Sequence, residues 1–319
     1  MELFHDVNID WLKLKWYFLG FSLIFSVAGI ISMSMHWAKI GSPVPLGVDF
    51  KGGTQLELQF QQSPDINRIR AAMDLAGVKD ARIQRYDEPS KNEVLISLPE
   101  QHNESNLDIG REQIVSALRD HYETPIVRNV QVVGPTVGRQ LQSKALLATL
   151  YSMLGMLIYL WFRFQLIYGV AAVVACFHDT LITVGAFALT NREMSLTVIA
   201  AILTLVGYSM NDTIVVFDRI RENLRLSRRE TLPDVVNRSI NQTLSRTVLT
   251  SGLTFLTVLS LYVFGGQVLN GFSFALVVGI LIGTYSSIAV AAPMLVAWLQ
   301  WRAGGGKAAV LPPAKRARV

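Results

Sequence analysis

The chain has 319 residues, of which 51% are hydrophobic and only 17% are charged, and its mean hydropathy is +0.35. Soluble globular proteins carry about 25% charged residues, so this composition excludes an ordinary soluble protein. A pI near 9.3 could suggest nucleic acid as a partner, but residues 37–143 carry a net charge of −2. The excess of positive charge therefore lies in and next to the apolar regions, where it reflects their orientation in the membrane. We expect no nucleic-acid partner.

Six apolar stretches are long enough to cross a bilayer core as helices. They lie at about residues 16–35, 145–162, 166–190, 194–217, 247–264 and 271–298. The first ends without a small-residue cleavage pattern, which predicts an uncleaved anchor rather than a signal peptide. The last is longer than a straight crossing requires and contains Pro293, which predicts a tilt or a kink. The sequence thus predicts a polytopic α-helical membrane protein with six transmembrane helices.

The distribution of Arg and Lys predicts the orientation of these spans. Seven arginines lie between Arg219 and Arg246, on the same side as both termini, whereas the short loops opposite contribute only Arg192. We therefore expect both termini in the cytoplasm and the domain at 37–143 on the outer side.

The predicted topology divides the chain into four parts. These are the N-terminus and first span at 1–36, a soluble domain at 37–143, a five-helix membrane domain at 144–300 and a disordered cytoplasmic tail at 301–319. The cytoplasmic loop at 218–246 carries an apolar face of Ile220, Leu224 and Leu226 among arginines. Such a face predicts helices that lie on the surface of an anionic membrane.

Residues 37–143 have the periodicity of a small α+β domain. Thr54–Phe60 alternates like a half-buried strand, and Ser63-Pro64-Asp65 opens a helix that stops at Gly77. The remaining elements are strands near 81–86, 93–98 and 126–133 and a second helix at about 105–121. The order βαββαβ predicts a ferredoxin-like sandwich, a fold that hosts many functions.

Two glycine motifs connect this domain to the spans. The entry motif is Gly47-Val48-Asp49-Phe50-Lys51-Gly52-Gly53-Thr54, and the exit motif is Gly134-Pro135-Thr136-Val137-Gly138. Tight turns that only orient the domain explain both motifs. The sharper hypothesis is a hinge that lets the domain tilt.

Ionisable side chains within the spans are costly and are therefore functional candidates. His178 and Asp179 lie midway along the third predicted span. Asp179 is too deep to reach either surface, so it must be paired or protonated. An interhelical hydrogen bond and proton transfer are both open hypotheses for it. His178 points about 100° away around the helix, so the two side chains need not share a partner.

A second candidate, Asp212, lies in the cytoplasmic half of the fourth span. Ser209 and Thr213 flank it, and together with Asn211 they form a polar lining in an otherwise apolar helix. A hydrated cavity lined by protein explains this stripe. The plainer alternative is an interfacial acid neutralised by Arg219.

Arg246 opens the fifth span from the same side as Asp212 and at a similar depth, which favours an Asp212–Arg246 pair. A carboxylate in such a place can couple protons to conformation, because burial raises its pKa and a nearby arginine lowers it. The proton is then the coupling ion, with a driving force of about 2.3 kcal/mol per charge per 100 mV.

No other chemistry is visible in the sequence. It contains no phosphate-binding glycine loop, no cluster of metal ligands and no nucleophile–base pair, and its single cysteine, Cys176, lies in an apolar run. We therefore expect neither an enzyme nor a bound metal or cofactor.

Five segments carry a family resemblance. They are GVDFKGGT at 47–54, GPTVG at 134–138, FHDTLIT at 177–183, VGYSMNDTIVVFDRIREN at 206–223 and LSRTVLTSG at 244–252. With them the sequence resembles, over about residues 15–300, the SecF family, the membrane subunits of the bacterial protein-export complex SecDF in the RND superfamily.

The resemblance implies an architecture, a function and partners. The chain would be half of an RND-type permease in the bacterial inner membrane, with a periplasmic domain at 37–143. With SecD it would use the proton motive force to promote late translocation of a preprotein through SecYEG, with YajC and YidC as further candidate partners. Asp212 and Arg246 match the family's functional acid and arginine.

Two functions of other classes stay open. An RND-type proton-driven exporter of small molecules or lipids would favour a larger outer domain with a substrate cleft. In a purely structural scaffold, the buried charges would only hold helices together.

Overall fold

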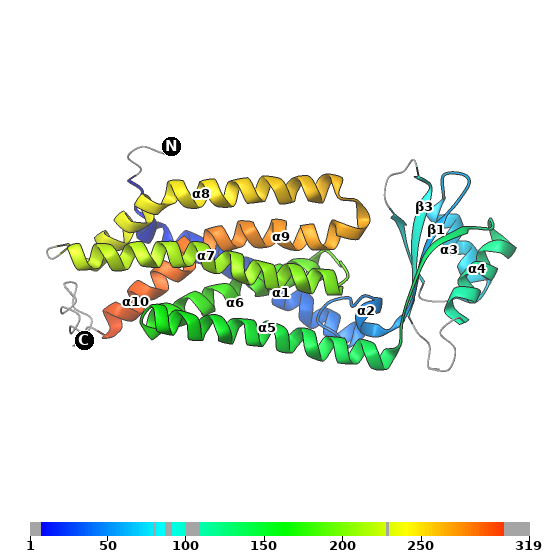
Figure 1. Cartoon of the computed structure of the whole chain (residues 1–319), viewed down its shortest axis with the longest axis horizontal. Helices are drawn as coiled ribbons and strands as arrows, with labels where there is room; N and C mark the ends of the chain where they lie inside the picture. Colours follow the sequence, from blue (N-terminus) through cyan, green and yellow to red (C-terminus); the bar gives the residue numbers. More distant parts are fainter. Residues whose placement is uncertain (1–7, 79–80, 87–90, 100–108, 228–229, 303–319) are drawn as a thin grey trace.

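The computed structural model of the protein describes residues 8–78, 81–86, 91–99, 109–227 and 230–302. A bundle of long helices carries a small α/β domain at one end (Figure 1). The long helices are α1 (Trp11–Ile40), α5 (Pro135–Arg163), α6 (Leu166–Leu189), α7 (Leu196–Leu226) and α8 (Leu232–Phe264), followed by α9 (Gly266–Ser286), the π-helical turn η2 (Ser287–Ala291) and α10 (Ala292–Arg302). Because α9, η2 and α10 form one continuous span, the described residues contain six helices that are long and apolar enough to cross a membrane. The predicted number of spans is confirmed.

The last span is irregular next to Pro293. Proline lacks an N–H group, and its ring collides with the carbonyl group four residues earlier in a regular helix. The structure accommodates this with the π-helical turn η2, which ends two residues before Pro293. Ser287, Ile288, Ala289 and Ala291 of this turn are buried, so the irregularity faces other helices rather than the outside of the bundle.

The segment predicted as a loop with surface helices has a different structure. α7 continues to Leu226, and α8 already begins at Leu232, so most of 218–246 extends these two long helices. The reason lies in packing. Ile220 is completely buried in a core cluster with Leu232, Val236 and other residues, while Leu226 is exposed. The apolar face is therefore covered mainly by protein.

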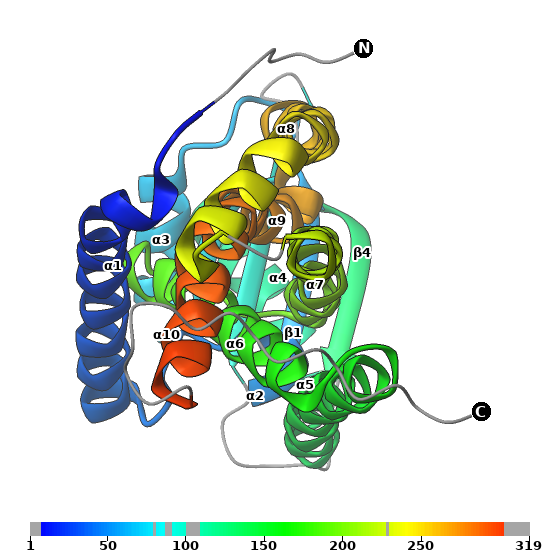
Figure 2. The same ribbon diagram turned by 90° about the vertical axis from the view of Figure 1, so that its left-hand side faces the viewer.

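The helices differ in how far the chain itself covers them. About half of the apolar stretch is buried in α6, in α7 and in the last span, against 11% in α1 and α5 and 17% in α8. In the view along the bundle, α1, α5 and α8 lie at its outside, and α6 and α10 lie between them (Figure 2). The outward side chains of α1, α5 and α8 must therefore contact lipid or another membrane protein.

The α/β domain confirms the predicted ferredoxin-like order. Its elements are β1 (Gly53–Gln59), α3 (Ile66–Leu75), β2 (Arg82–Tyr86), β3 (Glu93–Pro99), α4 (Ile109–His121) and β4 (Ile126–Val133). The strands form an antiparallel sheet in the order β2-β3-β1-β4. Buried residues such as Leu56, Ile69, Ile96 and Leu118 form the core between the sheet and α3 and α4. The predicted start of the second helix at 105–108 and the tail from 303 lie outside the described residues.

Candidate functional site

Asp179 is the centre of a polar network inside the helix bundle. Its side chain is completely buried on α6. Oδ2 accepts hydrogen bonds from Ser209 Oγ of α7 at 2.6 Å and from Ser286 Oγ of α9 at 2.7 Å, and Oδ1 lies 3.0 Å from His178 Nδ1. Three side chains from three helices thus surround one carboxyl group.

His178 extends this network to α1. Its Nε2 atom lies 2.8 Å from Ser22 Oγ, and Tyr285 OH of α9 donates to the carbonyl oxygen of Phe18 on α1. The sequence predicted that His178 and Asp179 need not share a partner, and the structure places the two side chains in direct contact with each other. A network that joins α1, α6, α7 and α9 can hold these helices together, because no water competes for such bonds within a membrane.

Asp212 lies in a different environment on α7. It is 3% exposed, and Ser251 Oγ of α8 donates a hydrogen bond to its Oδ2 atom at 2.5 Å. In the described part of the chain, Ser251 is its one side-chain hydrogen-bond partner. Asp212 lies about 24 Å along the helix axis from Leu196, at 1.5 Å per residue, which is within the thickness of a membrane core.

The structure does not bring Arg246 into contact with Asp212. Among the described residues no ion pair within 4 Å joins them, and the Arg246 side chain is exposed. Arg246 and Ser251 are five residues apart on α8, so they point about 140° apart around the helix. The alternative partner, Arg219, contacts Glu222 and Gln242 instead. Neither predicted partner of Asp212 therefore touches it.

The predicted polar lining of α7 divides between two faces. Ser209 and Thr213 are buried and point into the bundle, where Ser209 reaches Asp179. Asn211 is exposed at the outer surface of the helix. Arg246 and Thr250 of α8 are exposed as well, and Tyr208 OH donates to the carbonyl oxygen of Thr250 at 3.3 Å. The outside of α7 and α8 thus presents a polar surface, formed by Asn211, Arg246 and Thr250.

One buried hydroxyl group lies next to the Asp212 site. Thr247 Oγ1 is inaccessible and has no hydrogen-bond partner among the described residues. Thr247 precedes Ser251 by one helical turn, so both side chains lie on similar faces of α8. A buried polar atom without a partner commonly marks the position of a water molecule.

The two glycine motifs meet at the junction between the sheet and the bundle. The entry motif forms the short helix α2 (Val48–Lys51), whose Phe50 is buried against membrane-domain residues. Gly52 has φ of +79°, and a Cβ atom on it would lie 2.9 Å from the Pro135 Cα atom. A Cβ atom on Gly138 would lie 2.6 Å from the Phe50 carbonyl oxygen. Glycine is therefore required here for close approach of the two chain segments.

This junction also includes Asp49, whose carboxylate bridges the two domains. Its Oδ2 atom accepts a hydrogen bond from the Leu196 backbone N–H at the start of α7, at 2.9 Å. Its Oδ1 atom accepts one from Gln131 Nε2 of β4, also at 2.9 Å. A carboxylate at a helix N-terminus is favoured by the helix dipole. A tilt of the domain must therefore either break this contact or move the start of α7 together with the domain.

The close approach at Gly138 yields a prediction about stability. We expect Gly138→Ala to lower the thermal unfolding temperature of the purified protein by several degrees, because the methyl group must displace backbone atoms at a cost of about 1–3 kcal/mol. Gly134→Ala is the matched control, since Gly134 has φ of −70° and its Cβ position has open space. Equal unfolding temperatures for the two variants would show that the junction is loosely packed.

Sequence reasoning missed the hydroxyl groups that complete the two acidic sites. Ser22, Ser251, Ser286 and Tyr285 lie in apolar stretches that contain many other serines and threonines. Most hydroxyls in these helices bond to their own backbone, as Thr180, Thr204 and Thr254 do. The helical phase relative to Asp179 and Asp212 is the signal that distinguishes the functional ones, and it requires the neighbouring helix to be placed.

Comparison with known proteins identifies the family. Residues 113–301 match the model of the protein export membrane protein SecD/SecF, C-terminal, and residues 40–64 match the SecD/SecF GG motif. The chain is 55% identical to the protein translocase subunit SecF of Koribacter versatilis, covering 99% of this chain and 98% of that protein. It is 44% identical to the SecF subunit of Calditerrivibrio nitroreducens, covering 91% and 94%.

Solved structures agree with this result. The crystal structure of SecDF, a translocon-associated membrane protein from Thermus thermophilus, superimposes with a TM-score of 0.79 at 36% identity. A second SecDF structure, in the super-membrane-facing form, superimposes with a TM-score of 0.68, also at 36% identity. The two superpositions include 92–94% of this chain but only 39–40% of those longer chains. The chain belongs to the SecF family of protein translocase subunits, and it is a multi-pass membrane protein of the Sec export system.

Proposed function

We propose that this chain works with SecD in the bacterial inner membrane and uses the proton motive force to promote late translocation of preproteins through SecYEG. The observation that carries the proposal is Asp212, a buried carboxyl group within a membrane helix, held by one serine beside an unpartnered hydroxyl. The relatives' names and the SecDF structures support the export role. In this proposal both termini are cytoplasmic and the domain at 37–143 is periplasmic.

Asp212 supplies the proton-binding step. A carboxylate is costly in a membrane interior, and a neutral carboxyl group is not, so each protonation state favours a different degree of hydration around α7 and α8. We place the route of the proton on the side of Thr247, whose buried hydroxyl group has no partner among the described residues. The positive charge of Arg246 opposes binding of the proton to Asp212. The two states therefore differ in the relative position of these helices.

The movement reaches the periplasmic domain through Asp49. α7 carries Asp212 at its middle and Leu196 at its outer end, where Leu196 donates its N–H to Asp49. Asp49 in turn accepts from Gln131 of β4. A displacement of α7 is thereby passed to the sheet, with the glycine junction of Gly52 and Gly138 as its pivot.

Asp179 has a different role in this mechanism. Its carboxyl group has partners from α6, α7 and α9, and it is completely enclosed. This geometry favours a structural anchor, with His178 as its link to α1 through Ser22. Of the two hypotheses for Asp179, the interhelical bond has the stronger support.

The polar surface of Asn211, Arg246 and Thr250 is assigned to SecD. An exposed arginine and an exposed asparagine are unfavourable against lipid, so this surface needs a protein partner within the membrane. The solved SecDF chains are longer than this chain, which covers about two fifths of them, and SecD would supply the rest. YajC, YidC and SecYEG are further partners in the proposal, with contacts elsewhere.

Cysteine cross-linking in native membranes tests this assignment. In a Cys176→Ser background, Asn211→Cys is expected to give an oxidative or bifunctional cross-link to a second six-span chain, because that chain covers the polar surface. Leu154→Cys is the control, since Leu154 is also exposed, on α5, but lies on an apolar face. A cross-link from Leu154→Cys with none from Asn211→Cys would contradict the assignment, because SecD would then cover the α5 side of the bundle.

A further inference from the structure

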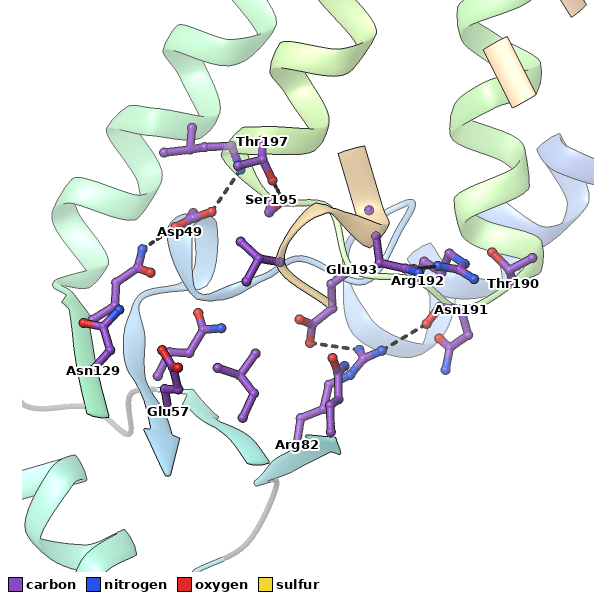
Figure 3. Close-up of a pocket in the computed structure, with 18 residues that line it drawn as sticks. Asp49, Glu57, Arg82, Asn129, Thr190, Asn191, Arg192, Glu193, Ser195 and Thr197 are labelled. Atoms are coloured by element: carbon purple, nitrogen blue, oxygen red, sulfur yellow. Dashed lines mark hydrogen bonds and ion pairs between the residues drawn. The ribbon is translucent and has the colours of Figure 1, made fainter. Parts of the chain in front are cut away.

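A cavity of about 780 Å³ separates the sheet from the outer end of the helix bundle. Its one wall is the face of the sheet that α3 and α4 leave uncovered, and its other wall is the α6–α7 loop at 190–195 with the start of α9 (Figure 3). Volumes of about 300–1,000 Å³ are typical of ligand sites. Asn129, Asn191 and Thr197 at its walls are exposed, so the cavity is accessible from solvent.

The charged groups of this cavity already have partners. Arg82 of β2 forms an ion pair with Glu193 at 2.9 Å and donates to the Asn191 carbonyl oxygen at 3.3 Å. Arg192 donates hydrogen bonds to Asn270 and Tyr262, and its guanidinium group stacks on Phe274. Burial raises the pKa of Glu193, while Arg82 and Lys51 act in the opposite direction. A small anion or cation would thus have to displace an existing partner.

The groups without partners are carboxamides. Gln55, Gln84 and Asn129 line the cavity, and none of them has a side-chain hydrogen bond within the described residues. They come from three strands, β1, β2 and β4. The strand register places Gln84, Leu95, Glu57 and Asn129 in one row across the sheet. Three strands, β2, β1 and β4, therefore contribute polar side chains to this row, and Leu95 of β3 lies between Gln84 and Glu57.

Carboxamides match one ligand chemistry in particular. Each has two N–H donors and a carbonyl acceptor, the same groups that a peptide backbone presents. Apolar lining is limited to Leu95, Leu196 and Val268, so the cavity has little to recognise a hydrophobic side chain. Recognition through the backbone is independent of sequence, and neutral hydrogen bonds of about 0.5–1.5 kcal/mol each give weak binding. A chain that must move onward requires both properties.

We propose that this cavity is a binding site for an extended, unfolded polypeptide segment, held by Gln55, Gln84 and Asn129 of the sheet. The proposal rests on the proposed function in one respect, namely that the cavity lies on the periplasmic side, where a translocating chain emerges. It adds a substrate contact on this subunit itself. A tilt of the sheet about its glycine junction would change the width of the cavity. The segment would then be bound in the narrow state and released in the wide state.

Site-specific photo-cross-linking tests the proposal in membrane vesicles that contain the whole export machinery. p-Benzoylphenylalanine replaces Gln84 or Asn129, and a preprotein with a tightly folded C-terminal domain is stalled during translocation. We expect ultraviolet light to join the preprotein to this chain at both positions. Leu75, exposed on α3 behind the sheet, is the matched control and is expected to give no adduct.

A second measurement separates hydrogen bonding from mere proximity. With the probe at Asn129, Gln55→Leu and Gln84→Leu should each reduce the adduct by about 2- to 10-fold, as expected for the loss of one hydrogen bond. Gln62→Leu, an exposed substitution outside the cavity, should leave it unchanged. Adducts with SecD or lipid instead of preprotein, or equal yields at Leu75, would overturn the proposal.

The same vesicles distinguish this proposal from the proposed function. Export that responds to the proton motive force without any cavity adduct would refute the polypeptide site alone. An adduct in vesicles whose export ignores the proton motive force would refute proton coupling and leave the site intact.

Discussion

Replacing Asp212 with asparagine is expected to abolish the stimulation of export by the proton motive force while the complex with SecD still assembles. Asparagine has the same shape and still accepts the hydrogen bond of Ser251, but it cannot bind a proton. One proton moving through 100 mV supplies about 2.3 kcal/mol, which corresponds to a bias of roughly 50-fold between two states. Pulse–chase measurement of preprotein processing, in cells depleted of the wild-type chain, gives the rate.

The control for this experiment lies on the same helix. Asp218 is exposed and 3.7 Å from Arg163, so Asp218→Asn changes one charge without reaching the buried site. The Asp218→Asn variant should export at the wild-type rate.

Arg246→Met should abolish the stimulation of export like Asp212→Asn, because it removes the positive charge that opposes protonation of Asp212. If the double variant regained full export, the two residues would be a structural charge pair, and the scaffold hypothesis would replace the coupling hypothesis.

The second large effect is expected for stability. Asp179→Leu should lower the free energy of unfolding by about 2–5 kcal/mol, since Ser209, Ser286 and His178 each lose a partner inside the bundle, at about 0.6–1.7 kcal/mol per bond. Thermal unfolding of the purified protein, followed by size-exclusion chromatography, measures this loss. Asp179→Asn keeps an acceptor and should lose far less.

Thr180→Val is the control for Asp179→Leu, because Thr180 lies on the same helix and, among the described residues, its hydroxyl group donates to its own backbone, at the Cys176 carbonyl oxygen. An Asp179→Leu protein as stable as this control would show that Asp179 does not anchor the helices. Export by Asp179→Asn decides between the two roles that the sequence left open. Normal export means a structural bond, and loss of export in a stable protein means proton transfer.

The sequence predicts the fold of this protein well, for physical reasons. A span is recognised by its apolar length and a strand by its alternation, and neither depends on the rest of the chain. Both signals gave the six helices and the βαββαβ order that the structure shows. The ends of α7 and α8 were harder to predict from the sequence. Ile220 and Val236 become buried only when the two helices pack side by side.

The candidate site was only partly predictable. Depth along a helix follows from counting residues, so Asp179 and Asp212 could be identified as buried acids. Which residue of the next helix faces a buried acid does not follow from depth alone, and Arg246 lies about 7.5 Å along α8 from the residue that contacts Asp212. Ser251, five residues further along α8, faces the carboxylate instead. The cavity was invisible in the sequence, since the sheet and the α6–α7 loop that form it are far apart along the chain.

Inverted membrane vesicles with an imposed proton gradient show whether proton binding at Asp212 drives export. The vesicles contain SecYEG, SecD and either the wild-type chain or Asp212→Asn, and completion of a partly translocated preprotein is measured. The gradient is expected to accelerate completion with the wild-type chain and to have no effect with Asp212→Asn. Equal acceleration of both would contradict a role of proton binding at Asp212 in export.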